Sequence, residues 1–269
     1  MKLAVKALTA QVCLWSSSAF VSRSTARSAA SLAAQLSMSA AVHKGDAESA
    51  QYTLYASAQC PYAQRSVITA NELGVPFKLH PIELGRDNKQ DWYQKINPLG
   101  KVPAVQAGDD IVVESLVINE YLVEKFGADA TSTLMPADAL GRALVRIAVQ
   151  RSSQLVDAYM GYLRTGDAEK EEAFVKELNN LEQILAKSTS GWLVGQHMTL
   201  ADVAYFPFFE RAIPCLAAFR GFDWDAAGVP HVMSWFERCK SRPAVAETLR
   251  KDPHEWVDIY SKYLGVPTK

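Results

Sequence analysis

The sequence predicts a two-domain protein in which an α+β domain is followed by an all-α helical domain. Three observations carry this prediction. Strand and helix patterns alternate over residues 51–127, only helical periodicity follows from about residue 138, and a loop-forming segment at 128–139 lies between them. The 269 residues are 49% hydrophobic and 21% charged, which is typical of a globular chain with a buried core.

The α+β domain begins with a strand that leads directly into a helix. "QYTLYAS" (51–57) alternates between two faces as a strand does. "PYAQRSVITANELG" (61–74) follows, and Pro61 suits the first turn of a helix. A second strand is expected at 75–84 and a short helix at 89–96.

The same domain ends with a hairpin and a helix. "KVPAVQAGDDIVVES" (101–115) contains two apolar runs joined by a turn at residues 108–110. "SLVINEYLVEKFG" (115–127) places its apolar residues on one helical stripe. The resulting order, β-α-β-α-β-β-α, is that of a thioredoxin-like domain, which we expect at about 51–127.

The second domain, expected at 138–264, shows helical periodicity alone. Its clearest local signal is "HMTLADVAYF", where Thr199 and Asp202 form a capping box and Met198 and Val203 occupy the hydrophobic staple positions around it. Helices are expected at about 138–163, 168–188, 199–219, 229–240 and 254–264.

The first 45 residues differ in composition from the rest of the chain. They contain Lys and Arg but no acid, and the first acidic residue is Asp46. A basic start and an apolar stretch ending near Ala19 indicate a signal peptide, and the Ser-, Ala- and Arg-rich segment after Phe20 is typical of a transit peptide. We expect residues 1–45 to be a bipartite presequence that directs the protein to the plastid of a secondary-plastid alga. The alternatives are a mitochondrial presequence, or a disordered tail on a cytoplasmic protein.

Charge and cysteine usage exclude several classes of protein. A net charge of −1 gives no reason to expect a nucleic-acid partner, and no apolar run reaches the ~18–20 residues of a membrane span. The histidines have no metal-ligand spacing, so no metal is expected. Apart from Cys13 in the presequence, the cysteines are too few and too scattered for a disulfide framework, which indicates a reducing compartment.

Cys60, in "SAQCPYAQRS", is the candidate nucleophile. A strand leading into a helix puts it at the helix N-terminus, where unpaired backbone N–H groups and the helix dipole favour the thiolate, with Arg65 one turn away. Ala63 stands where a Cys-x-x-Cys motif has its second cysteine, so an external thiol must resolve any mixed disulfide at Cys60. The alternative is a buried, inert cysteine, which is the expectation for Cys215 and Cys239.

Four motifs together resemble those of cytosolic-type glutathione transferases: "CPYAQRS", "INPLGKVPAV", "VVESLVINEYL" and "LVGQHMTLADVAYFPF". The cysteine makes the chain similar to the omega and lambda classes. The resemblance covers about residues 51–263 and implies the thioredoxin-like plus helical fold of that family.

The resemblance also implies a glutathione site. Val102 and Pro103 match the family's cis-proline turn, whose backbone pairs with the cysteinyl part of glutathione, while Glu114 and Ser115 match the pair that holds the γ-glutamyl end. Lys89 aligns with the lysine that holds the glycyl carboxylate. Arg86 is its rival for that role.

The activity that the resemblance implies is glutathione-dependent thiol transfer or dehydroascorbate reduction through a mixed disulfide at Cys60. The acceptor would be a small hydrophobic or oxidised molecule, and a homodimer is expected from the family alone. Two alternatives stay open. One is a non-catalytic protein that binds glutathione adducts, and the other is a relative of the intracellular chloride-channel proteins.

The presequence generates the first prediction. A fluorescent protein fused behind residues 1–45 should reach the plastid, and Phe20→Ala should impair delivery. Fluorescence microscopy of both fusions measures this. Cytosolic fluorescence of the unmutated fusion would contradict the targeting hypothesis.

Overall fold

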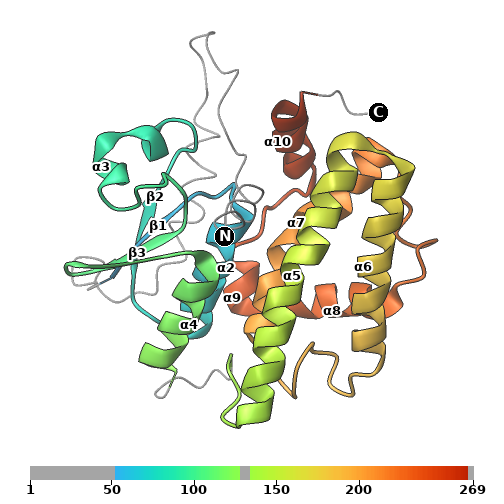
Figure 1. Cartoon of the computed structure of the whole chain (residues 1–269), viewed down its shortest axis with the longest axis horizontal. Coiled ribbons are helices and arrows are strands. Elements are labelled where there is room, and N and C mark those ends of the chain that lie inside the picture. Colours follow the sequence, from blue (N-terminus) through green and yellow to red (C-terminus); the bar gives the residue numbers. More distant parts are fainter. Residues whose placement is uncertain (1–51, 128–133, 266–269) are drawn as a thin grey trace, which may run out of the picture.

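The computed structural model describes residues 52–127 and 134–265. The presequence and the first half of the expected linker at 128–139 lie outside these ranges. The predicted fold class is confirmed: an α+β part with a thioredoxin-like sheet precedes a helical part, and the two lie side by side (Figure 1).

The sheet of the first part has the strand order β2-β1-β3-β4. Strands β1 and β2 are parallel, whereas β1–β3 and β3–β4 pair antiparallel, so β3 and β4 form the predicted hairpin. Its turn contains Gly108 at φ +64°, a conformation that glycine adopts without steric cost. The strands are β1 (Tyr52–Ala56), β2 (Lys78–Pro81), β3 (Ala104–Ala107) and β4 (Asp110–Val113).

Helices α2 (Pro61–Glu72) and α4 (Ser115–Phe126) pack against each other, and Ser66 Oγ donates to Asn119 Oδ1 over 3.0 Å. The helix expected at 89–96 is shorter than predicted. It consists of a 3₁₀ turn, η1 (Asp87–Lys89), followed by the single turn α3 (Asp91–Gln94).

The helical part contains the five expected helices and a short one that the sequence did not indicate. The added helix, α9 (Pro243–Ala246), is too short to produce a periodic pattern. The five are α5 (Ala139–Thr165), α6 (Ala168–Ala186), α7 (Leu200–Arg220), α8 (Pro230–Lys240) and α10 (His254–Leu264).

The capping box at the start of α7 is confirmed. Asp202 Oδ2 accepts a hydrogen bond of 2.8 Å from the Thr199 backbone N–H, and the Thr199 hydroxyl accepts one from the first turn of the helix. The other carboxylate oxygen accepts from Trp235 Nε1 over 2.8 Å and from the Leu193 N–H over 3.0 Å. Asp202 therefore fixes the start of α7 against α8 as well as capping it.

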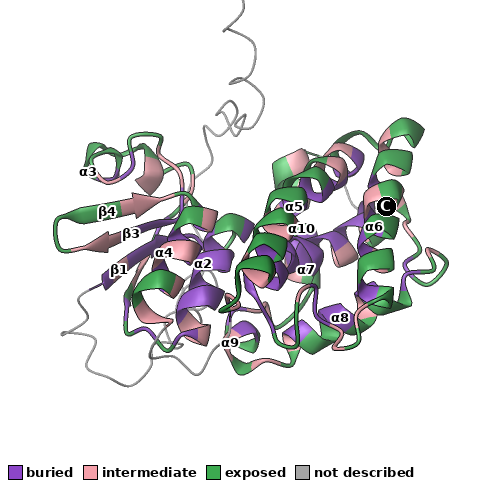
Figure 2. Ribbon diagram, turned by 60° about the horizontal axis from the view of Figure 1, so that its bottom comes forward, coloured by how far each residue is buried: buried purple, intermediate pink, exposed green. Residues whose placement is uncertain are grey.

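Helix α2 lies at the centre of the molecule, between α4 and the helical part, and it is buried along most of its length (Figure 2). Its polar side chains contact the helical part: Arg65 Nε donates to the Ala204 carbonyl over 2.9 Å, and Glu72 pairs with Arg242. The polar residues of α2 thus hold the two parts together.

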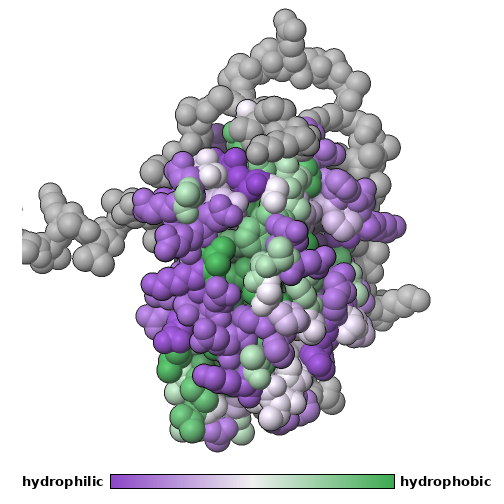
Figure 3. All heavy atoms as spheres, turned by 90° about the vertical axis from the view of Figure 1, so that its right-hand side faces the viewer, coloured by the Kyte–Doolittle hydropathy of each residue, from purple (hydrophilic) through white to green (hydrophobic). Residues whose placement is uncertain are grey.

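The described helices include none with the length and apolar character that crossing a membrane requires. Seen from the side of α6, the surface is largely hydrophilic, with hydrophobic residues gathered along its middle and at its lower left edge (Figure 3).

Candidate functional site

Cys60 is the N-cap residue of α2, with extended backbone angles of φ −89° and ψ 117°. Only 5% of the residue is exposed. Its Sγ lies 3.8 Å from the carbonyl oxygen of Val102, and the Val102–Pro103 peptide bond is cis. The strand-to-helix junction and the cis-proline turn therefore meet at the sulfur.

The register of the hairpin brings the other predicted residues to the same edge of the sheet. Ala104 pairs with Val113, so the residues just before β3 lie beside those just after β4. Val102 and Pro103 thus lie near Glu114 and Ser115, although ten residues lie between the two pairs along the chain. Tyr55, near the end of β1, pairs with Ala104 at this edge too.

Glu114 has an unusual backbone conformation. Its φ is +68°, in the region that L side chains rarely adopt, and such a conformation costs roughly 1–3 kcal/mol. Its side chain is exposed and caps no helix, whereas Ser115 is buried at the first position of α4. Strained residues of this kind cluster at binding sites. The strain is a signal that sequence alone did not provide.

Lys89 and its rival Arg86 differ in their ion pairs. Arg86 forms ion pairs with Glu83 and Asp87, at 2.6 and 2.9 Å. Lys89 is exposed and has no ion-pair partner among the described residues. The neighbouring Asn88 donates to the Gly100 carbonyl over 2.9 Å, which ties this segment to the loop that leads into the cis-proline turn.

The sequence predicted a lowered pKa for the Cys60 thiol, and this prediction is wrong. Burial raises the pKa of the thiol above its ordinary value, and this outweighs the opposing effects of the Ala63 and Tyr62 N–H groups and of the Arg211 and Arg65 charges. The helix N-terminus is where the sequence placed it, but the sequence did not show how deeply the sulfur is buried. In the described part of the chain, the other two thiols are also free and buried, and burial raises their pKa values, that of Cys215 to about 12.

Two buried charges near Cys60 were not predicted as site residues. Glu210 and Arg211, from the middle of α7, contact Gln64 of α2, and Arg211 Nη2 donates to the carbonyl of Gln59 over 3.5 Å. A signal was present in the sequence, because "FFERAI" places two adjacent charges in an otherwise apolar helix.

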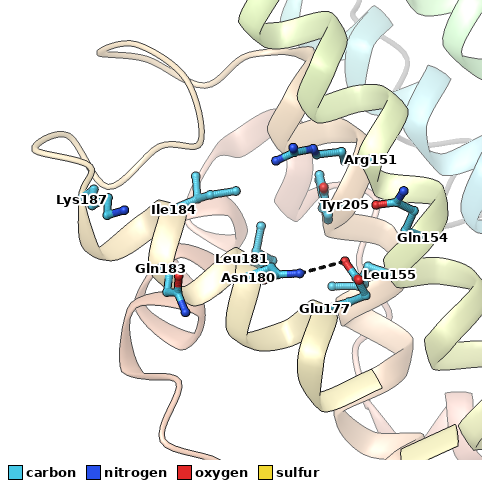
Figure 4. Close-up of a pocket in the computed structure, with 10 residues that line it drawn as sticks. All are labelled: Arg151, Gln154, Leu155, Glu177, Asn180, Leu181, Gln183, Ile184, Lys187 and Tyr205. Atoms are coloured by element: carbon cyan, nitrogen blue, oxygen red, sulfur yellow. Dashed lines mark hydrogen bonds between the residues drawn. The ribbon is translucent and has the colours of Figure 1, made fainter. Parts of the chain in front are cut away.

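A groove lies elsewhere, between α5 and α6, with a cavity volume of about 400 Å³ (Figure 4). Arg151 and Tyr205 point into it, and Asn180 donates to Glu177 along its wall. None of the predicted site residues lines this groove.

Three features occur together in this chain. A thioredoxin-like domain has a cysteine at the N-terminus of its first described helix, a cis-proline turn lies against the sulfur, and a helical domain packs behind that helix. This combination is typical of the glutathione transferase class of protein. Comparisons with known proteins agree. The model of the glutathione S-transferase N-terminal domain matches residues 54–130, and that of the C-terminal domain matches residues 154–238.

Individual relatives point to the cysteine-type classes. Glutathione S-transferase L3 of Arabidopsis thaliana is 34% identical over 211 residues, covering 78% of this chain and 86% of the relative. Glutathione S-transferase L2, chloroplastic, of the same plant is 29% identical over 78% of this chain and 69% of its own length. The crystal structure of glutathione transferase Omega 3C from Trametes versicolor superposes with a TM-score of 0.72 at 28% identity, covering 86% of this chain and 96% of the other. The chain belongs to the glutathione S-transferase family.

Proposed function

We propose that the protein is a glutathione-dependent thiol transferase that acts through a mixed disulfide at Cys60. The observation that carries this proposal is the position of the sulfur, at the N-terminus of α2 and 3.8 Å from the Val102 carbonyl. Ala63, where a resolving cysteine would stand, is fully buried and inert. A single thiol at such a site suits exchange with an external thiol.

The proposed reaction has two exchanges. The Cys60 thiolate attacks the glutathione sulfur of a mixed disulfide between glutathione and an acceptor thiol, and the acceptor leaves as its thiolate. A second glutathione thiolate then attacks the same sulfur, which releases oxidised glutathione and the Cys60 thiolate. Although burial raises the pKa of Cys60, a thiolate of higher pKa is also intrinsically more nucleophilic, which offsets part of the smaller ionised fraction. Reduction of dehydroascorbate at this site is a second proposed use of the same thiol.

The residues at the sheet edge are the proposed glutathione clamp. The Val102 backbone, beside the cis bond to Pro103, would pair with the cysteinyl part of the tripeptide. Ser115 and its N–H group at the start of α4 would hold the γ-glutamyl carboxylate, with Glu114 against the ammonium group. Lys89, exposed and without an ion-pair partner in the described part of the chain, would hold the glycyl carboxylate.

Plastid localisation and self-association remain proposals. A chloroplastic relative supports the first. The second is supported by exposed apolar side chains at helical spacing on α5, namely Leu140, Leu144 and Ile147.

Replacing Glu114 tests the clamp. Glu114→Ala should weaken glutathione binding by roughly 1.5–3 kcal/mol, the usual effect of losing a hydrogen bond to a charged group. Lys89→Ala should have a smaller effect where its partner, the glycyl carboxylate, stays exposed to solvent, because such an ion pair is screened by water. Isothermal titration calorimetry with reduced glutathione measures both. Glu124→Ala, on the same helix but ten residues away, is the matched control, and an unchanged affinity in Glu114→Ala would show that the site is misplaced.

Replacing the three described cysteines tests the single-thiol mechanism. Cys60→Ser should reduce glutathione-coupled disulfide reduction to background, because a hydroxyl cannot form the mixed disulfide. Glutathione should still bind, since the clamp does not need the sulfur. Cys215→Ser and Cys239→Ser should keep activity, because Cys215 lies within α7 and Cys239 near the end of α8, so neither is at a helix N-terminus beside the cis-proline turn. Substantial activity in Cys60→Ser, or its loss in a folded Cys239→Ser, would refute the mechanism.

A further inference from the structure

Three charged side chains are buried where α2 meets α7. Arg65 is 3% exposed, Glu210 is 8% exposed and Arg211 is fully buried. Arg65 bonds to the Ala204 carbonyl and the Ser152 hydroxyl rather than to a carboxylate. This contact therefore holds one more positive than negative charge, directly behind the helix that begins at Cys60.

The guanidinium of Arg211 is fixed from several sides. Its Nη1 donates to Gln64 Oε1 and to the Pro207 carbonyl, each over 2.6 Å, and the group lies 3.8 Å from the centre of the Trp256 ring. Its Nε has no acceptor among the described residues. Arg211 is thus held rigidly, and part of its hydrogen-bonding capacity is unused.

Glu210 and Arg211 form a long ion pair. The separation between Glu210 Oε2 and Arg211 Nη1 is 3.4 Å, longer than the bonds that the carboxylate accepts from neutral or backbone donors. Those bonds come from Gln64 Nε2 at 2.6 Å and Trp256 Nε1 at 3.1 Å. The shortest bonds of the carboxylate therefore come from neutral donors, and Arg211 directs its own shortest bonds to Gln64 and the Pro207 carbonyl.

Arg211 also reaches the backbone next to the nucleophile. Arg211 Nη2 donates to the carbonyl of Gln59, the residue just before Cys60. An excess buried cation is costly unless an anion accompanies it, and an ionised Cys60 would provide that anion. The two groups come from different domains, so docking of the helical domain is what brings them together.

We propose that Arg211 is a positioning residue that supplies the counter-charge for the Cys60 thiolate. The proposal rests on the proposed function in that it concerns the same nucleophile. It adds that a residue of the helical domain, held by Gln64, Glu210 and Trp256, sets how readily the thiol of the other domain ionises.

Several groups around Cys60 act with or against Arg211. Arg65 adds a weaker positive influence, and burial lowers its pKa to about 10. Tyr93 of α3 and Tyr260 of α10 also face Cys60, and burial raises the pKa values of both phenols, so both are neutral when the thiol ionises. Further titratable groups packed around the network in the described part of the chain are Tyr62, Tyr159, Tyr205, Glu210, Cys215 and Arg250.

The test is the pH dependence of Cys60 alkylation by iodoacetamide, followed by peptide mass spectrometry on the whole protein. Arg211→Gln should raise the midpoint pH by about one unit, which lowers the alkylation rate below the midpoint about tenfold. Glu210→Gln, which removes the negative charge and keeps the shape, should lower the midpoint. Arg211→Lys should stay closer to the wild type than Arg211→Gln.

Opposite shifts separate an electrostatic role from a structural one, because damaged packing would not move the midpoint in opposite directions. Arg220→Gln is the matched control, since Arg220 lies on the same helix and also bonds to carbonyls, those of Tyr162 and Leu163. Its midpoint should be unchanged.

An unchanged midpoint in a folded Arg211→Gln would overturn the proposal. If Arg211→Gln does not fold, Glu210→Gln decides, and an unchanged or raised midpoint in that variant overturns it equally. Alkylation needs neither glutathione nor an acceptor. The variants could therefore show the expected midpoint shifts even if the wild-type protein reduces no disulfide. That combination would refute the proposed function and leave this inference intact.

Discussion

The hydrogen bonds buried between α2 and α7 are the constraint on which the rest of the structure depends. Gln64 of α2 donates to Glu210 and accepts from Arg211, and neither partner has water as an alternative. Breaking one of these bonds leaves a buried charge or amide unpaired, which costs far more than the bond itself contributes. The thioredoxin-like part therefore cannot shift on the helical part without a large free-energy cost. Cys60, at the start of α2, is fixed with it.

This arrangement places opposing influences on one thiol. Packing α2 between two domains removes water from Cys60, which raises the pKa of the thiol, while the helix N–H groups and two buried arginines lower it. The balance matters for the proposed chemistry, because thiol exchange needs both a sufficient thiolate fraction and a strong nucleophile. Burial that is opposed by fixed positive charge meets both requirements better than burial alone. The helical domain then contributes to the chemistry as well as covering the site.

The order of elements was readable from the sequence because strand alternation, helical periodicity and the Thr199–Asp202 capping box are local signals. The contact between Cys60 and Val102 could be predicted only from the family resemblance, because it joins segments that are distant along the chain. Three features were beyond local patterns. The strain at Glu114 is a backbone property, the burial of Cys60 depends on domain docking, and the role of Arg211 depends on a contact across 147 residues of chain. The short α9 was missed because four residues carry no period.

The central claim is that Cys60 is a glutathione-reactive thiol in an intact site, and intact-mass spectrometry after incubation with oxidised glutathione tests it most directly. The account predicts a mass increase of one glutathionyl group, located at Cys60 by peptide mapping and removed by reduced glutathione. Cys215 and Cys239 should stay unmodified while the protein is folded, because both are fully buried inside helices, whereas Cys60 keeps 5% of its surface exposed at the N-terminus of α2. A folded protein that forms no adduct, or forms it at Cys215 or Cys239, would contradict the account.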